Sequence, residues 1–439
     1  MGAAGKDFHT FNVFMRDNPA IDVVCFTAAQ IPFIANRTYP AVIAGKRYPN
    51  GVPIYPEEQL EALIEREDIT DVYFSYSDTS YDYLMHRAAM VQSRGASFHL
   101  VGPRDTMIKA NKPVVAVVAV RTGAGKSTLS RKVSDIIVKR GLKPVVVRHP
   151  MPYSDLSVAV QRFEDAEDLD RYHVTVEERE EYESHINRGL VVFAGVDYEA
   201  ILKQAEAEGD VIVWDGGNND WSFFIPDVNI VVADPLRPGH ESRYYPGETN
   251  VRMADIIVVN KVNVATKDDV EKVVQACGKL NPRARVIKMR SEAVLDRPDW
   301  VRGRRVLVVE DGPSVTHGEL AYGAGAVAAR AVDAILVDPR DRAVGGIKAA
   351  YEKYPTLGSV LPALGYSDAQ LKELEESINA VDCDAVVLGT PADLTKLIRI
   401  GKPVARVGFE AYDEGKPSLE DLLSDRVESF KRLVHAAPA

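Results

Sequence analysis

The sequence predicts an α/β protein in which parallel sheets are covered by helices. Short apolar runs alternate with amphipathic helical patterns along the whole chain, and this alternation is typical of strands joined by helical crossovers. A chain of 439 residues is also too long for one hydrophobic core, because such cores stop growing at roughly 250–300 residues. We therefore expect three regions, at residues 1–108, 109–302 and 303–439.

Composition and charge narrow the class of protein. Apolar residues make up 46% of the chain and charged residues 27%, as in globular proteins. The net charge of -11 argues against nucleic acid as a partner, because binding to a phosphate backbone needs clustered Lys and Arg. The three cysteines are widely spaced, and we find no signal peptide or long apolar run. We expect a cytoplasmic protein with reduced thiols that does not enter a membrane.

The strand-like runs are distributed over all three regions. The first region has runs at residues 23–26, 72–74 and 98–101, a helical pattern at 57–65 and a linker at 103–113. The second region has runs at residues 114–120, 144–147, 191–193, 211–214, 230–233, 256–260 and 286–289. The third region has runs at residues 306–310, 334–337, 385–389 and 404–407. The second region therefore has enough strands for a complete parallel sheet, and the third reads as a smaller α/β unit.

A glycine-rich loop follows the first strand of the second region and precedes an amphipathic helical pattern. Residues 121–128 read R-T-G-A-G-K-S-T, and such a loop turns backbone N–H groups and a helix N-terminus toward phosphate. Lys126 is expected to reach the terminal phosphates, and the hydroxyl of Ser127 to bind Mg²⁺. The second region thus reads as a P-loop nucleotide-binding domain, whose expected nucleotide contacts are Gly123, Ala124, Gly125, Lys126, Ser127 and Thr128.

The start of this loop departs from the common pattern. Val120 stands where G-x-x-x-x-G-K-[ST] has its first glycine, so the loop aligns better with the deviant form K-G-G-x-G-K-[ST]. That form resembles the branch of dethiobiotin-synthetase-like and MinD-like proteins, in which a lysine near the loop start reaches the nucleotide of a partner subunit. Arg121 occupies that place here. The resemblance implies a homodimer in which Arg121 acts catalytically across the interface.

A carboxylate ends the strand at 211–214. The segment V-I-V-W-D-G-G-N-N-D places Asp215 at the carboxyl end of a buried strand and follows it with glycines. Such a carboxylate, beside a phosphate loop, can hold the water shell of Mg²⁺. Asp215 is the expected second metal anchor, with Asp220 as a weaker candidate; a helix cap is the alternative role for a strand-end Asp.

The segment I-I-V-V-N-K-V-N resembles the N-K-x-D element that reads a purine base. Asn260 and Lys261 are therefore expected to contact the nucleotide. Asn263 stands where guanine recognition needs a carboxylate, because guanine presents two donors and a neutral amide has one acceptor oxygen. We expect ATP as the nucleotide and keep GTP as the alternative.

Two loops at strand ends carry candidates for the second substrate, in the place where such sheets bind ligands. Arg148 and His149 follow one strand, with Asp155 nearby, and a second loop carries Arg237, His240 and Arg243. Arginines suit phosphate and carboxylate groups alike. The alternative is that they pair with acidic residues at 164–183, among which Glu181 belongs to a run expected to be a solvated helix face.

Several of these segments together resemble the family of cyclic 2,3-diphosphoglycerate synthetase-like P-loop proteins. They are the opening G-A-A-G-K-D-F-H, which looks like a Rossmann-type first loop with no strand before it, and R-T-G-A-G-K-S, V-V-V-R-H-P-M-P-Y, W-D-G-G-N-N-D and D-P-x-R-P-G-H. The resemblance implies a Rossmann-like N-terminal domain and ATP-dependent closure of the phosphoanhydride of 2,3-diphosphoglycerate, with Mg²⁺, in a cytoplasmic dimer.

The residues alone favour a ligase or kinase acting on a small anionic phosphorylated metabolite. In this reading Lys126, Asp215, Arg121 and His149 are catalytic, and Arg148, Arg237, His240 and Arg243 bind the substrate. A GTPase switch or metallochaperone that acts on a protein partner is the alternative, although the sequence has no CxxC or His-rich metal-transfer segment. A binding module without catalysis is a third reading.

Overall fold

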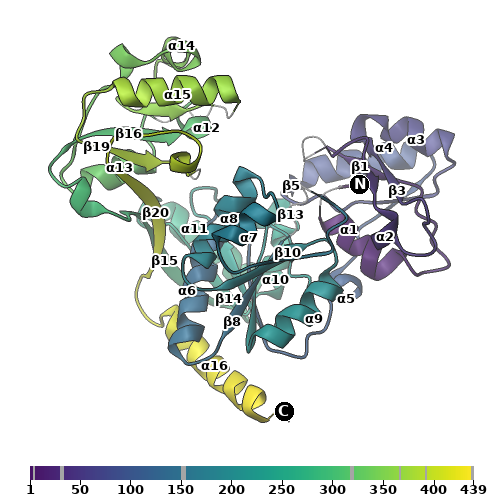
Figure 1. Cartoon of the computed structure of the whole chain (residues 1–439). Coiled ribbons are helices and arrows are strands. Elements are labelled where there is room, and N and C mark those ends of the chain that lie inside the picture. Colours follow the sequence, from purple (N-terminus) through teal and green to yellow (C-terminus); the bar gives the residue numbers. More distant parts are fainter. Residues whose placement is uncertain are drawn as a thin grey trace. The chain divides into compact units, whose positions relative to one another are not determined.

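The computed structural model describes residues 1–2, 5–29, 34–149, 155–316, 321–364, 367–390 and 393–436. They form two compact units (Figure 1), one made of Met1–Arg290 with Ala411–Ala439 and the other of Ser291–Glu410. These units differ from the three expected regions, whose boundaries at 108 and 302 stay predictions. Among the described residues, no helix combines the length and the apolar character needed to cross a membrane.

The centre of the first unit is a mostly parallel sheet with the strand order β15-β14-β12-β7-β11-β8-β10-β9. Its neighbours pair in parallel except β9, which is antiparallel to β10. The strands are β7 (Val114–Ala119), β8 (Pro144–Arg148), β9 (Val160–Phe163), β10 (Val191–Gly195), β11 (Val211–Asp215), β12 (Val228–Ala233), β14 (Ile256–Val259) and β15 (Arg285–Leu295). The predicted α/β fold is confirmed, and β9 is the one strand here that the apolar runs did not indicate.

Helices cover both faces of this sheet (Figure 1). Alternate residues of β7 point to opposite faces, so Val115 and Val117 join one core and Ala116 and Val118 the other. The first core includes residues of α6 (Lys126–Lys139), α8 (Val176–Ile186) and the last helix, α16 (Leu419–Ala436). The second includes residues of α9 (Tyr198–Glu208), α10 (Gly247–Met253) and α11 (Lys267–Leu280). The end of the chain therefore packs on the sheet of the P-loop.

The N-terminal part forms two small parallel pairings instead of one sheet. In one, β1 (Phe26–Ala28) pairs with β3 (Val52–Pro56), which also pairs antiparallel with β2 (Thr38–Tyr39). In the other, β4 (Asp71–Tyr73) pairs with β6 (Ser97–His99). The helices here are α1 (Lys6–Thr10), continued by a π-helical turn at Phe11–Met15, and α2 (Ala41–Ala44), α3 (Leu60–Arg66), α4 (Tyr81–Ser93) and α5 (Pro103–Thr106).

This part is also tied to the central sheet region by strand pairing. Strand β5 (Thr79–Ser80) pairs antiparallel with β13 (Tyr244–Tyr245), although the two segments are far apart in the sequence. In the expected linker at 103–113, Ile108 forms an isolated bridge with Phe224. The N-terminal part and the P-loop region therefore belong to one compact unit.

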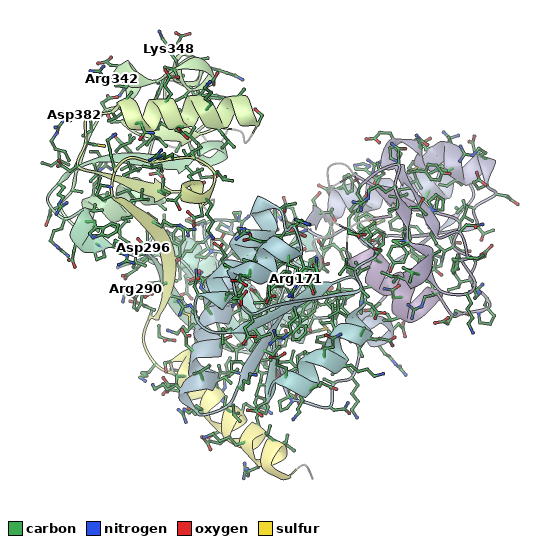
Figure 2. The ribbon with its side chains drawn as sticks, viewed as in Figure 1. Arg171, Arg290, Asp296, Arg342, Lys348 and Asp382 are labelled. Carbon is green, nitrogen blue, oxygen red and sulfur yellow. The ribbon has the colours of Figure 1, made fainter. Side chains whose placement is uncertain are left out.

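The second unit is a smaller α/β unit, as predicted. Its central strand, β16 (Arg305–Asp311), pairs in parallel with β17 (Ile335–Leu336), β18 (Leu361–Ala363) and β19 (Ala385–Gly389), and β19 pairs with β20 (Val404–Asp413). Its helices are α12 (Gly312–Val315), α13 (Ala324–Arg330), α14 (Gly345–Lys353) and α15 (Asp368–Ala380). Charged side chains such as Arg342, Lys348 and Asp382 project from its surface (Figure 2).

A buried carboxylate lies at the start of α13. Glu310 has no exposed surface, and its oxygens accept hydrogen bonds from the backbone nitrogens of Gly323, Gly325 and Ala326 at 3.0, 3.0 and 2.8 Å. These amides belong to the turn and first residues of the helix. Glu310 therefore satisfies donors that would otherwise be left unpaired.

Candidate nucleotide-binding site

The loop at 121–128 has the strand, loop and helix arrangement that the sequence predicted. Strand β7 ends at Ala119, and α6 begins at Lys126. Gly123 and Gly125 have φ values of +78° and +109°, a region that favours glycine. A Cβ on Gly125 would also lie 2.3 Å from Nδ2 of Asn260. The two glycines therefore permit both the turn and the close approach of Asn260.

Two side chains after β14 hold the carbonyl groups of this loop. Asn260 Nδ2 donates to the carbonyl oxygen of Ala124 at 2.9 Å, and Lys261 Nζ donates to that of Gly123 at 2.6 Å. With its carbonyls engaged from one side, the loop can present N–H groups elsewhere, as phosphate binding requires. The structure thus gives Asn260 and Lys261 a contact with the loop backbone. Their role in reading a base stays a prediction, and Asn263 lies in an exposed turn.

A buried aspartate organises the same side of the loop. Asp234 Oδ2 lies 2.7 Å from Arg237 Nη2 and 3.1 Å from Lys261 Nζ. Arg237 Nη2 also donates to the carbonyl oxygen of Thr122 at 2.7 Å. Arg237 therefore lies beside the nucleotide loop, where the sequence predicted a substrate contact, and its observed partners are Asp234 and the loop backbone.

Lys126 is almost fully buried at the start of α6. Its side chain is 8% exposed, and Nζ donates to the carbonyl oxygen of Asn218 at 2.5 Å. Burial lowers the pKa of the ammonium from 10.5 to about 8, against the opposing effect of the Asp215 carboxylate. A phosphate group would offer this ammonium the charge that a carbonyl oxygen lacks. The helix also contains Thr128, whose Oγ1 accepts from Arg131 at 3.2 Å.

Asp215 ends β11, beside β7, and has no exposed surface. Its Oδ2 lies 2.5 Å from Arg148 Nη1 and 2.8 Å from His185 Nε2. Burial alone would raise the pKa of this carboxyl, but the charge of Arg148 and the bond to His185 hold it well below its usual range. Among the described residues, Oδ1 has no hydrogen-bond partner. One oxygen of a charged carboxylate is thus available to a further ligand.

Glu181 links this cluster to the loop. Its Oε2 lies 2.8 Å from Arg148 Nη2 and accepts from Ser127 Oγ at 3.4 Å. The expectation that the acidic run is only a solvated helix face is therefore wrong for Glu181. Sequence spacing held the missing signal, because Glu181 and His185 are four residues apart on α8 and share one side of the helix. Both reach the cluster around Arg148 and Asp215.

These oxygens are suited to Mg²⁺. The Ser127 hydroxyl, the Glu181 carboxylate and the free Oδ1 of Asp215 are hard oxygen ligands. Across the described part of the chain, no cluster of three or more His, Cys, Asp or Glu side chains could hold a metal without help. The donor set therefore fits an ion that keeps water and phosphate oxygens as its other ligands, as Mg²⁺ does at nucleotide sites.

His149 lies in a second buried cluster, next to the first. Its Nε2 is 3.5 Å from Asp220 Oδ2, and Asp220 Oδ1 is 3.8 Å from Lys6 Nζ of α1. Burial lowers the pKa of His149 to about 3 and raises that of Asp220 to about 6. Lys6 also lies 3.6 Å from the centroid of the Trp221 ring. The sequence indicated His149, but it did not indicate Lys6, which belongs to the same cluster through Asp220.

Other predicted residues are less closely involved. Asp155 is exposed, and its Oδ1 accepts from the backbone nitrogen of Ser157 at 2.8 Å in a local turn. Arg243 is also exposed. Residues 150–154, which complete the motif V-V-V-R-H-P-M-P-Y and its loop, lie outside the described residues.

Arg121 is engaged by residues of its own chain. Its Nε lies 2.5 Å from Asp78 Oδ1, and its Nη1 lies 2.8 Å from His240 Nδ1. The guanidinium also stacks over the Tyr244 ring at 3.6 Å. His240 is thus near the loop as predicted, with Arg121 as its partner. These contacts do not support a role for Arg121 across a dimer interface, which stays a prediction.

His9 provides a pH-dependent test of the packing between α1 and the central region. The ring is stacked on Phe223, with centroids 3.9 Å apart and an interplanar angle of 1°, and Nε2 lies 2.6 Å from the carbonyl oxygen of Thr106. Burial lowers the pKa of His9 from 6.5 to about 3. The unfolded chain therefore binds a proton more readily than the folded chain between these two values.

We expect His9 to make the protein less stable as the pH falls below 6.5. A group with a lowered folded-state pKa contributes stability above its unfolded pKa, and at about pH 5.5 the loss for one His is about 1.4 kcal/mol. Urea denaturation at several pH values measures it in wild type and in His9→Gln, which keeps a donor for Thr106 but does not titrate. The difference in the free energy of unfolding between wild type and His9→Gln should be smaller by that amount at about pH 5.5 than at neutral pH. A difference that is constant with pH contradicts the prediction.

Comparison with individual known proteins shows the family of this chain. A scan of family models found none that matches the chain. Arginine synthetase ArcE of Thermococcus kodakarensis is 54% identical over 435 residues, which are 99% of this chain and 97% of that protein. Cyclic 2,3-diphosphoglycerate synthetase of Thermococcus sibiricus is 22% identical over 250 residues, which are 51% of this chain and 55% of that protein.

Among solved structures, LpxK of Aquifex aeolicus in complex with ATP aligns with a TM-score of 0.44 and 14% identity, over 80% of this chain and 95% of its own. The hydrogenase maturation factor HypB of Archaeoglobus fulgidus aligns with a TM-score of 0.24 and 16% identity, over 40% of this chain and 80% of its own. The 54% identity to the first relative extends over nearly the full length of both chains, and it shows to which family this chain belongs. The chain belongs to the family of arginine synthetase ArcE and is an enzyme of the synthetase type.

Proposed function

We propose that this enzyme is an ATP-dependent ligase that binds Mg²⁺-ATP at the loop 121–128 and forms arginine. The main support for nucleotide binding is the buried Lys126, which lies at the end of the glycine loop and near the charged carboxylate of Asp215. The arginine product is inferred from the relative with 54% identity. Neither inference depends on the solved structures, which are too distant to indicate a reaction.

The loop residues would bind and orient the nucleotide. The N–H groups at 123–128 and the start of α6 would contact its phosphates, and Lys126 would exchange the Asn218 carbonyl for a phosphate oxygen. Ser127, Asp215 and Glu181 would hold Mg²⁺, which neutralises phosphate charge when bound. Arg148 would keep Asp215 and Glu181 in place, because it contacts both carboxylates. Positioning and charge neutralisation would supply most of the catalysis.

The chemistry of a guanidinium group indicates the reaction class. A guanidinium can be made from a ureido group when its oxygen is converted into a leaving group. The γ-phosphoryl group of ATP is transferred to the ureido oxygen and ADP leaves. The nitrogen of ammonia then forms a bond to the ureido carbon, the C–O bond breaks, and phosphate leaves with that oxygen and one proton. The second substrate would be the ureido counterpart of arginine, whose α-carboxylate is an anion.

The binding site for this second substrate is also a proposal. His149 and His240 lie near the loop, as do Arg148 and Arg237, but both arginines have acidic partners in their own chain. A carboxylate substrate would have to share or replace those partners. We therefore place His149 with Asp220 closest to the acceptor and assign Arg148 to holding the carboxylates.

A second candidate reaction is closure of the phosphoanhydride of 2,3-diphosphoglycerate. It is favoured by the resemblance of the sequence motifs and by the relative with 22% identity, which matches about half of the chain. Use of ATP in place of GTP, the homodimer and a cytoplasmic location also belong to the proposal. The GTPase switch or metallochaperone remains the alternative from another class.

A turnover assay tests these functions against one another. Purified protein with Mg²⁺ and either ATP or GTP is supplied with the ureido counterpart of arginine plus ammonium, with 2,3-diphosphoglycerate, or with no acceptor. We expect ADP and arginine in equal amounts in the first mixture only. Release of nucleoside diphosphate at the same rate without any acceptor would overturn the ligase proposal in favour of a switch. A cyclic phosphoanhydride in the second mixture, detected by ³¹P NMR, would establish the second candidate.

A further inference from the structure

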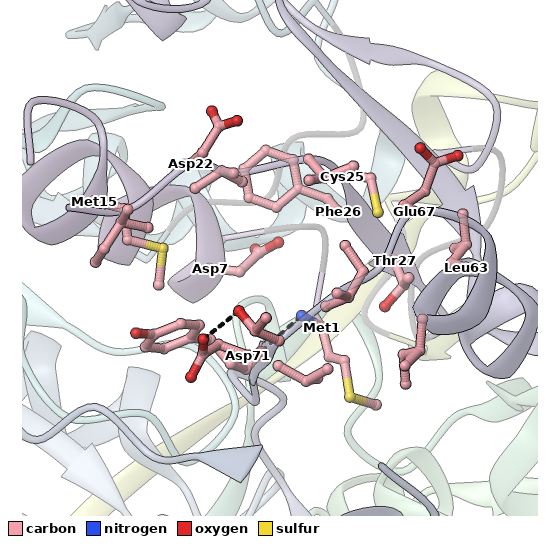
Figure 3. A pocket seen from close by; sticks show the side chains of 18 of the residues that line it. Met1, Asp7, Met15, Asp22, Cys25, Phe26, Thr27, Leu63, Glu67 and Asp71 are labelled. Atoms are coloured by element: carbon pink, nitrogen blue, oxygen red, sulfur yellow. Dashed lines mark hydrogen bonds between the residues drawn. The ribbon is translucent and has the colours of Figure 1, made fainter. Parts of the chain in front are cut away.

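The N-terminal part contains a cavity of about 450 Å³ that is remote in sequence from the nucleotide loop. Its walls include two stretches without helix, residues 21–27 and 69–73. Figure 3 shows Met1 at the cavity, between a side that carries Cys25 and Phe26 and a side that carries Asp71. Met15, Leu63 and other apolar side chains also line it. The cavity is therefore a slot between these two segments, and nothing in the proposed function uses it.

The first two residues are bonded to both sides of this slot at once. On one side, Gly2 N donates to the carbonyl oxygen of Thr27 at 3.0 Å. On the other, Met1 N donates to that of Tyr73 at 2.8 Å, and Ser75 N donates to the carbonyl oxygen of Met1 at 2.9 Å. A segment with backbone hydrogen bonds to two neighbours occupies the position of a central strand. Met1 and Gly2 thus have the place of the last residues of such a strand.

The direction of the neighbouring strands indicates where the rest of this strand would run. Both small sheets contain parallel pairs, β1 with β3 and β4 with β6. A strand that enters Met1 parallel to β1 and β4 would pass residues 22–26 on one side and 69–72 on the other. These residues line the cavity. The sequence also predicted a strand at 23–26, whereas β1 begins only at Phe26.

The charge at Met1 is also poorly suited to this position. Its ammonium group is enclosed, and burial lowers its pKa, because a charged group is disfavoured away from water. A peptide N–H in the same place would donate the same hydrogen bond to Tyr73 without the charge. The position therefore suits the interior of a chain better than a charged group.

We infer that this cavity is the seat of a β-strand formed by chain that leads into Met1, and that the strand joins the two small sheets into one. The sheet order would be β2-β3-β1, the added strand, then β4-β6. Five residues at about 3.3 Å each would pass residues 22–26. Because both faces would be covered, the segment should be apolar and rich in β-branched residues. The completed strand would then lie directly before α1 in the sequence.

Extensions of the full chain test this inference. One variant carries five residues before Met1 that are all Val or Ile, and a matched control carries five that are Gly or Ser. The apolar extension should raise the Tm by at least about 5 °C and slow amide exchange at residues 22–26 and 69–72 at least about tenfold, with no such change in the control. Equal Tm values and equal exchange rates for the two extensions would overturn the inference.

Cys25 provides a second measurement that does not depend on a gain in stability. It lines the cavity and is half-buried, whereas Cys383 of the second unit has similar exposure and serves as an internal reference. The apolar extension should slow the reaction of Cys25 with a thiol reagent at least about fivefold and leave Cys383 unchanged. Because the rim carries Asp22, Glu67 and Asp71, free arginine is the competing occupant. Protection of Cys25 by arginine, but not by the extension, contradicts the inference.

Discussion

Lys126→Ala is expected to reduce ATP-dependent turnover about 1000-fold, because it removes the charge that would meet the transferring phosphoryl group. The loss should appear in kcat/KM for ATP and in the affinity for Mg²⁺-ATP measured by calorimetry. Lys126 is buried, and burial lowers the pKa of its ammonium to about 8. We therefore expect the variant to be at least as stable as wild type, as when a functional site is itself destabilising.

Lys139→Ala is the matched control on the same helix. Lys139 lies in the last turn of α6, is 67% exposed and pairs with Glu420 at 3.0 Å. Its removal should leave turnover and nucleotide affinity within about twofold of wild type, because an exposed ion pair contributes little. If Lys126→Ala binds Mg²⁺-ATP as tightly as this control, the loop is not the nucleotide site.

Arg148→Met is expected to lower the free energy of unfolding by about 3–5 kcal/mol, because it leaves the buried carboxylate of Asp215 without its cation, as well as the half-buried one of Glu181. Arg148 is 2% exposed and lies between Asp215 and Glu181. Methionine fills much of the same volume, so the loss would report on charge more than on packing. Urea denaturation at neutral pH measures it. Adding Asp215→Asn to Arg148→Met should recover part of the loss, since the two groups are coupled.

Arg162→Met is the matched control for this change. Arg162 also contacts two acidic side chains, Glu164 and Glu208, but it is 33% exposed. Solvent screens such a pair, and the expected loss is at most about 1 kcal/mol. Equal losses for the two variants would show that burial of the Arg148 cluster has no special effect on stability.

The sequence was a good guide to the central sheet because its strands are buried on both faces. Runs such as 114–120 and 211–214 are apolar throughout, as strands covered by helices on both sides must be, and they coincide with β7 and β11. The loop at 121–128 was also predicted correctly, because the positive φ values at Gly123 and Gly125 favour glycine and so leave a pattern in the sequence. The short β9 was not indicated, since it pairs only at the edge of the sheet, where burial is incomplete.

Contacts between distant segments were beyond what local patterns encode. Nothing near Arg121 in the sequence indicates Asp78, which is 43 positions away and reaches it through the pairing of β5 with β13. Glu181 was hidden in an acidic run, because composition does not tell which member of the run faces the core. The position of α16 was not predictable either. Its amphipathic pattern indicates a buried face but not which sheet that face packs against, which is the central sheet.

The carboxylate of Glu310 affects how the protein would respond to added anions. The amides of Gly323, Gly325 and Ala326 already donate hydrogen bonds to carboxylate oxygens that are part of the chain. A free phosphate in solution would have to displace this tethered competitor, which never diffuses away from its partners. Inhibition of the enzyme by inorganic phosphate or sulfate should therefore arise from competition with the nucleotide. Binding of the anion to the amides at the start of α13 should not contribute to it.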